Sequence, residues 1–226
     1  MDQNAASLKV LADSQKTAFP YVIRVGKLAI EVHKNVFSPK HFNGWKIFHA
    51  LLPDTKGTDV LEVGTGTGVT AAYMAAHGAR SVMALDINPH AVKNARTNAR
   101  RNSLKNMTVR ESNIFSALKK TETFDTIYWN TPFMYAPHRY KYRNVLERGL
   151  FDPGYRITDR FLKGCKKHLR KGGRVLFGTG NFGDIPRFLA LAKKHGYRIK
   201  VLGVRKSREI KPVTFDLYEL TLPSQR

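Results

Sequence analysis

The stretch that decides the fold reads Val60-Leu61-Glu62-Val63-Gly64-Thr65-Gly66-Thr67-Gly68. An apolar run leads into three glycines spaced by two, and a helical pattern follows them. A glycine-rich turn between a strand and a helix lets a ligand approach the backbone and the helix N-terminus. The spacing differs from the G-x-G-x-x-G of a dinucleotide site. Glu62, just before the turn, would repel a pyrophosphate, so the stretch indicates a site for a cationic ligand.

Strands and helices alternate on the C-terminal side of this turn, which predicts an α/β fold with a mostly parallel sheet covered on both faces. No helix separates the last two candidate strands, so the final strand is expected to pair antiparallel. The seven expected strands are residues 59–63, 81–86, 107–111, 124–129, 173–179, 197–204 and 215–222, and the helices are 68–77, 89–102, 157–169 and 185–195.

The N-terminal part predicts a helix over residues 5–17, a hairpin over 21–31 that turns at Gly26, and a helix over 42–52. We therefore divide the chain into an N-terminal extension, residues 1–52, that packs on a core domain, residues 53–226. Residues 134–155 carry no clear helix or strand pattern. So long a connection is either functional or mobile.

A second motif, Asp86-Ile87-Asn88-Pro89, follows the second strand of the core. A carboxylate at this point can accept hydrogen bonds from both hydroxyls of a ribose. The alternative is that Asp86 caps the next helix. Asn88 fills that role better, since it stands directly before Pro89 as an N-cap. We therefore assign Asp86 to a ribose.

A third motif, Asn130-Thr131-Pro132-Phe133, follows the fourth strand. Together the three motifs resemble the class I S-adenosylmethionine-dependent methyltransferases, and the third is similar to the Asn-Pro-Pro-Tyr/Phe motif of nitrogen methyltransferases. The resemblance implies a Rossmann-like, doubly wound seven-stranded sheet and S-adenosylmethionine as the cofactor. It also implies that the cofactor is bound by Pro39, Glu62, Gly64, Thr65, Gly66, Gly68, Asp86, Ile87, Asn113, Ile114 and Asn130.

The catalytic residues implied by the third motif are Asn130, Pro132 and Phe133. An asparagine oxygen and a neighbouring carbonyl can accept the N–H groups of a planar amine or amide and turn its lone pair toward the methyl group, so catalysis is mostly positioning. The aromatic ring stacks on the acceptor. Thr131 departs from the usual proline; it adds an N–H and is expected to loosen the backbone. The alternative is an ordinary turn after a strand.

Two groups of relatives compete over about residues 32–222. Protein-glutamine methyltransferases resemble the chain in Asp86-Ile87-Asn88-Pro89 and Leu150-Phe151-Asp152-Pro153-Gly154. Ribosomal-RNA guanine-N2 methyltransferases resemble it in Val36-Phe37-Ser38-Pro39 and Ser112-Asn113-Ile114-Phe115. The resemblance leaves the acceptor open between them.

The net charge of +22 is the second strong signal, with 39 Lys and Arg against 17 Asp and Glu. Such an excess repels itself unless a polyanion is near, which points to RNA or a ribosomal particle as partner. The alternative is that the whole proteome is basic or that the charge serves solubility. The segment after the third motif interleaves cations and aromatics, which can hold phosphates and stack bases, or form a solvated loop. The substrate residues expected here are Tyr135, Arg139, Tyr140 and Lys141.

The remaining features exclude several classes of function. Cys165 is the single cysteine and falls in a helical pattern, so a buried, inert thiol is expected. The histidines show no ligand spacing, and no metal is predicted. No signal peptide or apolar run of membrane-spanning length is present, which makes the expected location cytoplasmic. A small-molecule acceptor and a non-catalytic RNA-binding protein stay as alternatives, and the oligomeric state is open.

Overall fold

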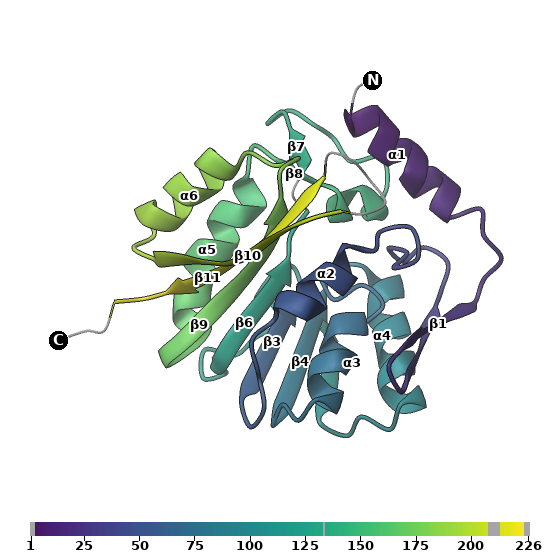
Figure 1. Ribbon diagram of the computed structural model, residues 1–226, viewed down its shortest axis with the longest axis horizontal. Helices are drawn as coiled ribbons and strands as arrows, with labels where there is room; N and C mark the ends of the chain where they lie inside the picture. The colour runs from purple at the N-terminus through teal and green to yellow at the C-terminus, as the bar shows by residue number, and fades with distance from the viewer. Residues whose placement is uncertain (1–2, 133, 208–212, 224–226) are drawn as a thin grey trace.

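The protein is described by a computed structural model that covers residues 3–132, 134–207 and 213–223. A seven-stranded sheet forms its centre, with helices on both faces (Figure 1). The strand order is β10-β11-β9-β6-β3-β4-β5, and β11 runs antiparallel to both of its neighbours, as predicted. The strands are β3 (Asp59–Val63), β4 (Ser81–Asp86), β5 (Met107–Glu111), β6 (Phe124–Asn130), β9 (Leu169–Gly180), β10 (Arg198–Lys206) and β11 (Thr214–Thr221).

Two helical layers cover the sheet because the central strands are apolar on both faces. One layer holds α2 (Gly44–Leu51), α3 (Val69–Ala76) and α4 (Pro89–Arg101), and the other holds α5 (Arg156–His168) and α6 (Ile185–Lys194) (Figure 1). Each layer has its own apolar core, centred on Phe48 and Tyr128 on one face and on Phe161 and Phe188 on the other. Cys165 is buried in the second core, where burial raises its pKa well above the usual value.

The start of α4 confirms the predicted cap. The Asn88 side chain accepts a hydrogen bond from the backbone N–H of His90, and Pro89 takes the first helical position. Asn88, and not Asp86, therefore caps this helix, and Asp86 is the last residue of β4.

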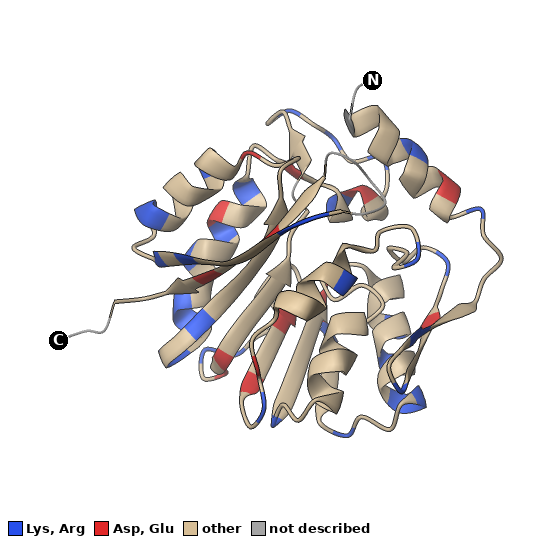
Figure 2. Cartoon of the chain, viewed as in Figure 1, with Lys and Arg blue, Asp and Glu red and all other residues tan. Residues whose placement is uncertain are grey.

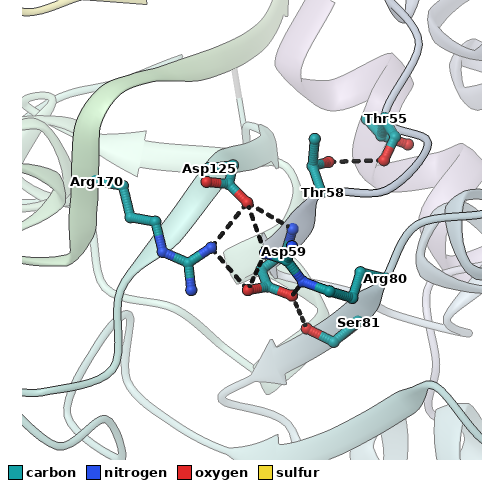
Figure 3. Close-up of polar contacts among 7 residues, drawn as sticks. All are labelled: Thr55, Thr58, Asp59, Arg80, Ser81, Asp125 and Arg170. Atoms are coloured by element: carbon teal, nitrogen blue, oxygen red, sulfur yellow. Dashed lines mark hydrogen bonds and ion pairs between the residues drawn. The ribbon is translucent and has the colours of Figure 1, made fainter.

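An ion-pair cluster closes the other end of the sheet, at the N-termini of the parallel strands (Figure 3). Arg80 and Arg170 both bridge the carboxylates of Asp59 and Asp125 at 2.7–3.3 Å. The hydrogen bond from Arg80, supported by Ser81 and Arg170, holds the pKa of Asp59 well below its usual value. These two arginines are therefore compensated within the fold and do not add to the free positive charge.

The N-terminal segment packs on the core through asparagines. It forms α1 (Gln3–Ser14) and a hairpin of β1 (Tyr21–Val25) and β2 (Leu28–Val32), as predicted. One edge of β2 pairs with β1, and its other edge meets three side chains of α4 spaced one turn apart: Asn94, Asn98 and Asn102. Their amides hydrogen-bond the backbone of Ala29, Glu31 and His33 at 2.8–3.0 Å. Asparagine carries both a donor and an acceptor, so it satisfies a strand edge much as another strand would.

Asn98 also joins this hairpin to the glycine turn, because its Nδ2 donates to the Thr67 carbonyl at 2.8 Å. Replacing Asn98, which is fully buried, with alanine leaves the backbone groups of Glu31 and the Thr67 carbonyl without this partner. We expect the free energy of unfolding to fall by about 3 kcal/mol, since each buried unsatisfied group costs about 1–3 kcal/mol. Denaturant unfolding checks this. Thr97→Ala, on the outer side of the same helix, is the control and should change it by less than about 0.5 kcal/mol.

The long segment without a sequence pattern has a defined structure. It contains β7 (Met134–Ala136), a 3₁₀ helix η1 (Val145–Gly149) and β8 (Phe151–Pro153), and β7 pairs parallel with β8. The Asn144 side chain caps η1 by accepting from the N–H groups of Leu146 and Glu147. In the part of the chain that the structure describes, no helix has the length and apolar character needed to span a membrane.

Candidate functional site

A cavity of about 610 Å³ lies at the carboxyl ends of β3, β4 and β6, where ligands bind in open α/β sheets. The three sequence motifs meet there, although they are far apart in the chain. The predicted residues that line it are Pro39, Glu62, Gly64, Thr65, Gly66, Asp86, Ile87, Asn113, Ile114, Asn130 and Pro132. Phe133 lies outside the described residues.

The glycine turn serves two purposes. Gly64 and Gly66 line the cavity with φ of +69° and +57°, a backbone region that favours glycine. A Cβ on Gly64 would come within 3.2 Å of Trp129 Nε1, so a side chain there would also press on the core. Gly68 does not line the cavity. A Cβ there would lie 2.9 Å from that of Ala95, so Gly68 lets α3 and α4 pack closely rather than meeting the ligand.

Glu62 is buried at the base of this turn, with only 4% of its surface exposed. Its Oε2 accepts hydrogen bonds from the Thr65 hydroxyl and, at 3.1 Å, from the Ala71 N–H. Burial raises the pKa of Glu62 to about 8 despite these bonds. The carboxyl group therefore holds a proton at neutral pH in the cofactor-free protein, and it can ionise when a cation binds beside it; its hydrogen bonds hold the turn in shape.

Asp86 bridges the turn and the following helix. Its Oδ2 accepts from the Gly66 N–H and its Oδ1 from the Asn88 N–H, both at 2.8 Å. Burial raises its pKa. The Ile87 N–H also interacts with this carboxyl group. A carboxylate has about four lone-pair sites, so a site remains for a hydroxyl group of a ligand.

The neighbouring wall carries the residues predicted for a planar ring. Asn113 is exposed and lines the cavity, and Ile114 is held at φ +58° in the bend that follows β5. The Ile114 carbonyl accepts from the Ser112 hydroxyl at 2.9 Å, which fixes this bend. Pro39 lies buried in another wall, and its carbonyl accepts from Trp45 Nε1 at 2.8 Å.

Asn130 is the last residue of β6 and is exposed into the cavity. The next residue corrects one expectation. The N–H and the hydroxyl of Thr131 both donate to the Gly178 carbonyl of β9, each at 2.9 Å. The expected loosening of the backbone was wrong, because the N–H that threonine adds is used to hold the loop against β9.

Apart from Phe37, which lies in the motif Val36-Phe37-Ser38-Pro39, the outer wall of the cavity could not be found from sequence motifs. It comes from α1, from η1 and from aromatic residues on four separate loops and elements. For the wall residues that lie on helices, the amphipathic pattern of the helix was the available sequence signal. The residues of the outer wall are Ala6, Ser7, Val10, Phe37, Phe42, Trp45, Leu146, Arg148, Phe182 and Phe215.

The predicted substrate residues lie beside the cavity rather than in its lining. Tyr140 packs inward. Its hydroxyl donates to Glu147 at 2.8 Å, and the centroid of its ring lies 5.0 Å from that of the Phe151 ring. Its role is therefore to hold this segment together, and its ring is not presented to a base. Tyr135, Arg139 and Lys141 are exposed, on a segment whose two ends, at Met134 and Val145, line the cavity.

The polar groups that border the cavity fit S-adenosylmethionine. Two buried carboxyl groups, Glu62 and Asp86, border it in a chain of net charge +22. Such a site disfavours phosphates and suits a sulfonium and an ammonium group. In the glycine turn beside these acids, a Cβ on Gly66 would meet no atom within 4 Å, so a ligand can approach the backbone there.

Comparison with known proteins gives a consistent result. A family model described as "Methyltransferase small domain" matches residues 27–196. A putative protein N5-glutamine methyltransferase of Methanocaldococcus jannaschii is 31% identical over 80% of this chain and 90% of its own length. A ribosomal RNA small subunit methyltransferase C of Salmonella choleraesuis is 30% identical over 63% of this chain. A release factor glutamine methyltransferase of Koribacter versatilis is 31% identical over 58%.

This chain spans only 37% and 49% of the last two relatives. Among solved structures, the T. thermophilus 16S rRNA N2 G1207 methyltransferase, determined with AdoMet and guanosine, matches with a TM-score of 0.65 at 18% identity. The match covers 90% of this chain and 50% of that one. An M. jannaschii tRNA m1G37 methyltransferase gives 0.64 at 16% identity, covering 92% and 57%. These two matches support the fold assignment.

Proposed function

Because the chain belongs to the methyltransferase small domain family, we propose that it methylates a planar amide or exocyclic amine nitrogen of a macromolecule in the translation apparatus. It is an S-adenosylmethionine-dependent methyltransferase, and the acceptor is the part that is proposed. The observation that carries the proposal is the position of Asn130, at the end of β6 and in the same cavity as Glu62 and Asp86.

Bound S-adenosylmethionine supplies an electrophilic methyl group on a sulfonium. The chain supplies the geometry around it. Asp86 offers its carboxylate to the ribose, Asn113 offers its amide to the adenine edge, and Glu62 balances the positive charge of the methionine end. The remaining group is Asn130, which lines the same cavity and to which the resemblance assigns the acceptor as well as a contact with the cofactor.

The Asn130 side-chain oxygen can accept one N–H of the acceptor, and the Thr131 carbonyl can accept a second. In an amide or an exocyclic amine the nitrogen lone pair is delocalised into the π system. Two fixed acceptors turn the group so that the lone pair points to the methyl group and stabilise the positive charge that develops on nitrogen. The new N–C bond forms as the S–C bond breaks, which leaves neutral S-adenosylhomocysteine. The methylated nitrogen then carries the positive charge and releases its proton to water, so no strong base is needed.

Two observations support a macromolecular acceptor from translation. The relatives include enzymes named for release factors and for ribosomal RNA. In addition, Lys and Arg recur along α4, α5 and α6 and in several loops (Figure 2). Four acidic residues are buried instead: Glu62, Asp86, Glu147 and Asp152. The unbalanced charge is therefore on the outside, where a polyanion can meet it. A protein glutamine is the second candidate, favoured by the archaeal relative that matches over 90% of its length.

Salt dependence separates an RNA or ribosomal acceptor from a free protein. For RNA, the affinity should fall with a log–log slope of about −0.7 per phosphate neutralised on a single strand. Arg139, Lys141 and Arg143 are exposed between the cavity-lining residues Met134 and Val145. Replacing all three with alanine should flatten the slope by about 2. Binding to ribosomal RNA fragments at several salt concentrations measures this.

The matched control replaces Arg160, Lys163 and Lys167, exposed on the outer face of α5, and removes the same charge. It should leave the slope nearly unchanged if RNA meets the segment after β7. The wild type could instead bind RNA weakly, with a flat salt response, and methylate a protein fraction. That result would show that the acceptor is a protein glutamine and not RNA. Methylation of small metabolites alone would contradict the proposal.

A further inference from the structure

The loop that carries Asn130 is held to β9 by one residue. Thr131 donates both its backbone N–H and its hydroxyl to the Gly178 carbonyl, each at 2.9 Å, and only 5% of its surface is exposed. A carbonyl oxygen has two lone pairs, so a single acceptor can serve both donors. The N–H bond could come from any residue except proline. The hydroxyl bond is a property of threonine or serine.

These two hydrogen bonds constrain the peptide unit that follows Thr131. The bond from the Thr131 N–H limits the φ angle of this residue, and the bond from its hydroxyl selects one side-chain rotamer. On the other side, Pro132 restricts the preceding residue to extended conformations. The Thr131 carbonyl lies between these two constraints, so its direction is fixed without an acceptor present.

Gly178, whose carbonyl accepts both bonds, is itself held in place by its neighbours. Gly178 pairs with Asn130 in the parallel ladder of β6 and β9. A Cβ on Gly178 would come within 3.0 Å of the Phe48 ring, which is fully buried on α2. A glycine is required at this point so that α2 can pack onto β9. Trp45, one turn before Phe48 on α2, lines the cavity. Through Gly178 and Phe48, the hydrogen bonds of Thr131 therefore connect the loop of Asn130 to the wall that α2 forms.

We propose that Thr131 is a positioning residue: its hydroxyl, through Gly178, holds the Thr131 carbonyl in the direction that accepts an N–H of the methyl acceptor. This inference rests on the proposed function, because it assigns the carbonyl to the same acceptor nitrogen as Asn130. It gives threonine the task that a rigid proline has in the Asn-Pro-Pro motif, by hydrogen bonding instead of a ring.

The test compares Thr131→Val, which keeps the shape and loses the hydroxyl, with Thr131→Ser, which keeps the hydroxyl. Valine should lower turnover about three- to tenfold, the equivalent of one hydrogen bond, with an unchanged KM for S-adenosylmethionine. Serine should stay near wild type. Turnover is measured as transfer of labelled methyl groups to the RNA and protein fractions of cells that lack the enzyme. Thr126→Val, buried near the opposite end of β6, is the matched control and should leave turnover unchanged.

Hydrogen exchange of the backbone amide of residue 131 gives a second readout that needs no acceptor. It should be faster in Thr131→Val than in the wild type and Thr131→Ser. Unchanged exchange and unchanged turnover in the valine variant would overturn the inference, as would a serine variant that is as impaired as valine. If the wild type methylates neither fraction, the proposed function fails, while the exchange comparison still decides whether the hydroxyl holds the loop.

Discussion

Replacing Asn130 with alanine is expected to lower methyl transfer by about two or more orders of magnitude while the affinity for S-adenosylmethionine stays nearly intact. The side chain stands at the end of β6 and is exposed into the cavity. Its removal takes away an acceptor that orients the nitrogen and stabilises the charge developing on it, and such groups contribute at this scale. Single-turnover kinetics with labelled cofactor measures the chemical step, and calorimetry measures binding.

Asn113→Ala is the matched control, since it removes the same side chain from the part of the cavity after β5, which β3 and β4 separate from β6 in the sheet. It should weaken cofactor binding and leave the rate at saturating cofactor close to that of the wild type. The two asparagines thus separate binding from chemistry. Full turnover of Asn130→Ala on the true acceptor would show that the planar-nitrogen mechanism is wrong.

The parts of the fold that the sequence predicted best are those with local causes. The parallel strands read as apolar runs because both of their faces are buried, and glycine or a polar residue marks their ends. Asn88 and Pro89 define the start of α4 by cap chemistry alone. The residues at the carboxyl ends of β3, β4 and β6 could be assigned to one site because parallel strands end on the same edge.

The parts that could not be predicted depend on register between distant segments. The bond from Thr131 to Gly178 requires the pairing of β6 with β9, and no local signal contains it. The same holds for Asn94, Asn98 and Asn102, which read as polar helix residues until β2 lies beside them. Tyr140 looked like a stacking residue, and only the buried Glu147 turns its hydroxyl inward.

Cofactor affinity is expected to rise with pH, by up to tenfold per unit between about pH 6 and 8. Glu62 is buried, and its pKa is raised from 4.5 to about 8. Below pH 8 the carboxyl group therefore holds a proton in the cofactor-free protein. A sulfonium nearby favours the carboxylate, so binding releases that proton and becomes stronger as the proton is removed. Above about pH 8 the group is already ionised and the dependence ends.

The groups around Glu62 do not produce the same profile. Burial lowers the pKa of His49 to about 4, so this residue, whose ring bonds Thr70, is neutral over the whole range. Burial likewise raises the pKa of Tyr128 well above its usual value, so its hydroxyl stays protonated. Asp86 faces the turn from β4, and its pKa is also raised by burial, but the ribose hydroxyls that it would meet are neutral and draw its proton off less strongly than a sulfonium does that of Glu62. Glu62→Gln removes only the titrating group on β3, and its affinity should vary with pH much less than that of the wild type from pH 6 to 8.

Calorimetry in two buffers of different ionisation enthalpy counts the protons released on binding. Near pH 6.5 the wild type should release close to one proton and Glu62→Gln close to none. If the wild type binds equally well at pH 6 and pH 8 and releases no proton, Glu62 is ionised before the cofactor arrives. Its hydrogen bonds from Thr65 and Ala71 would then outweigh its burial, and its role would be to hold the glycine turn without proton exchange.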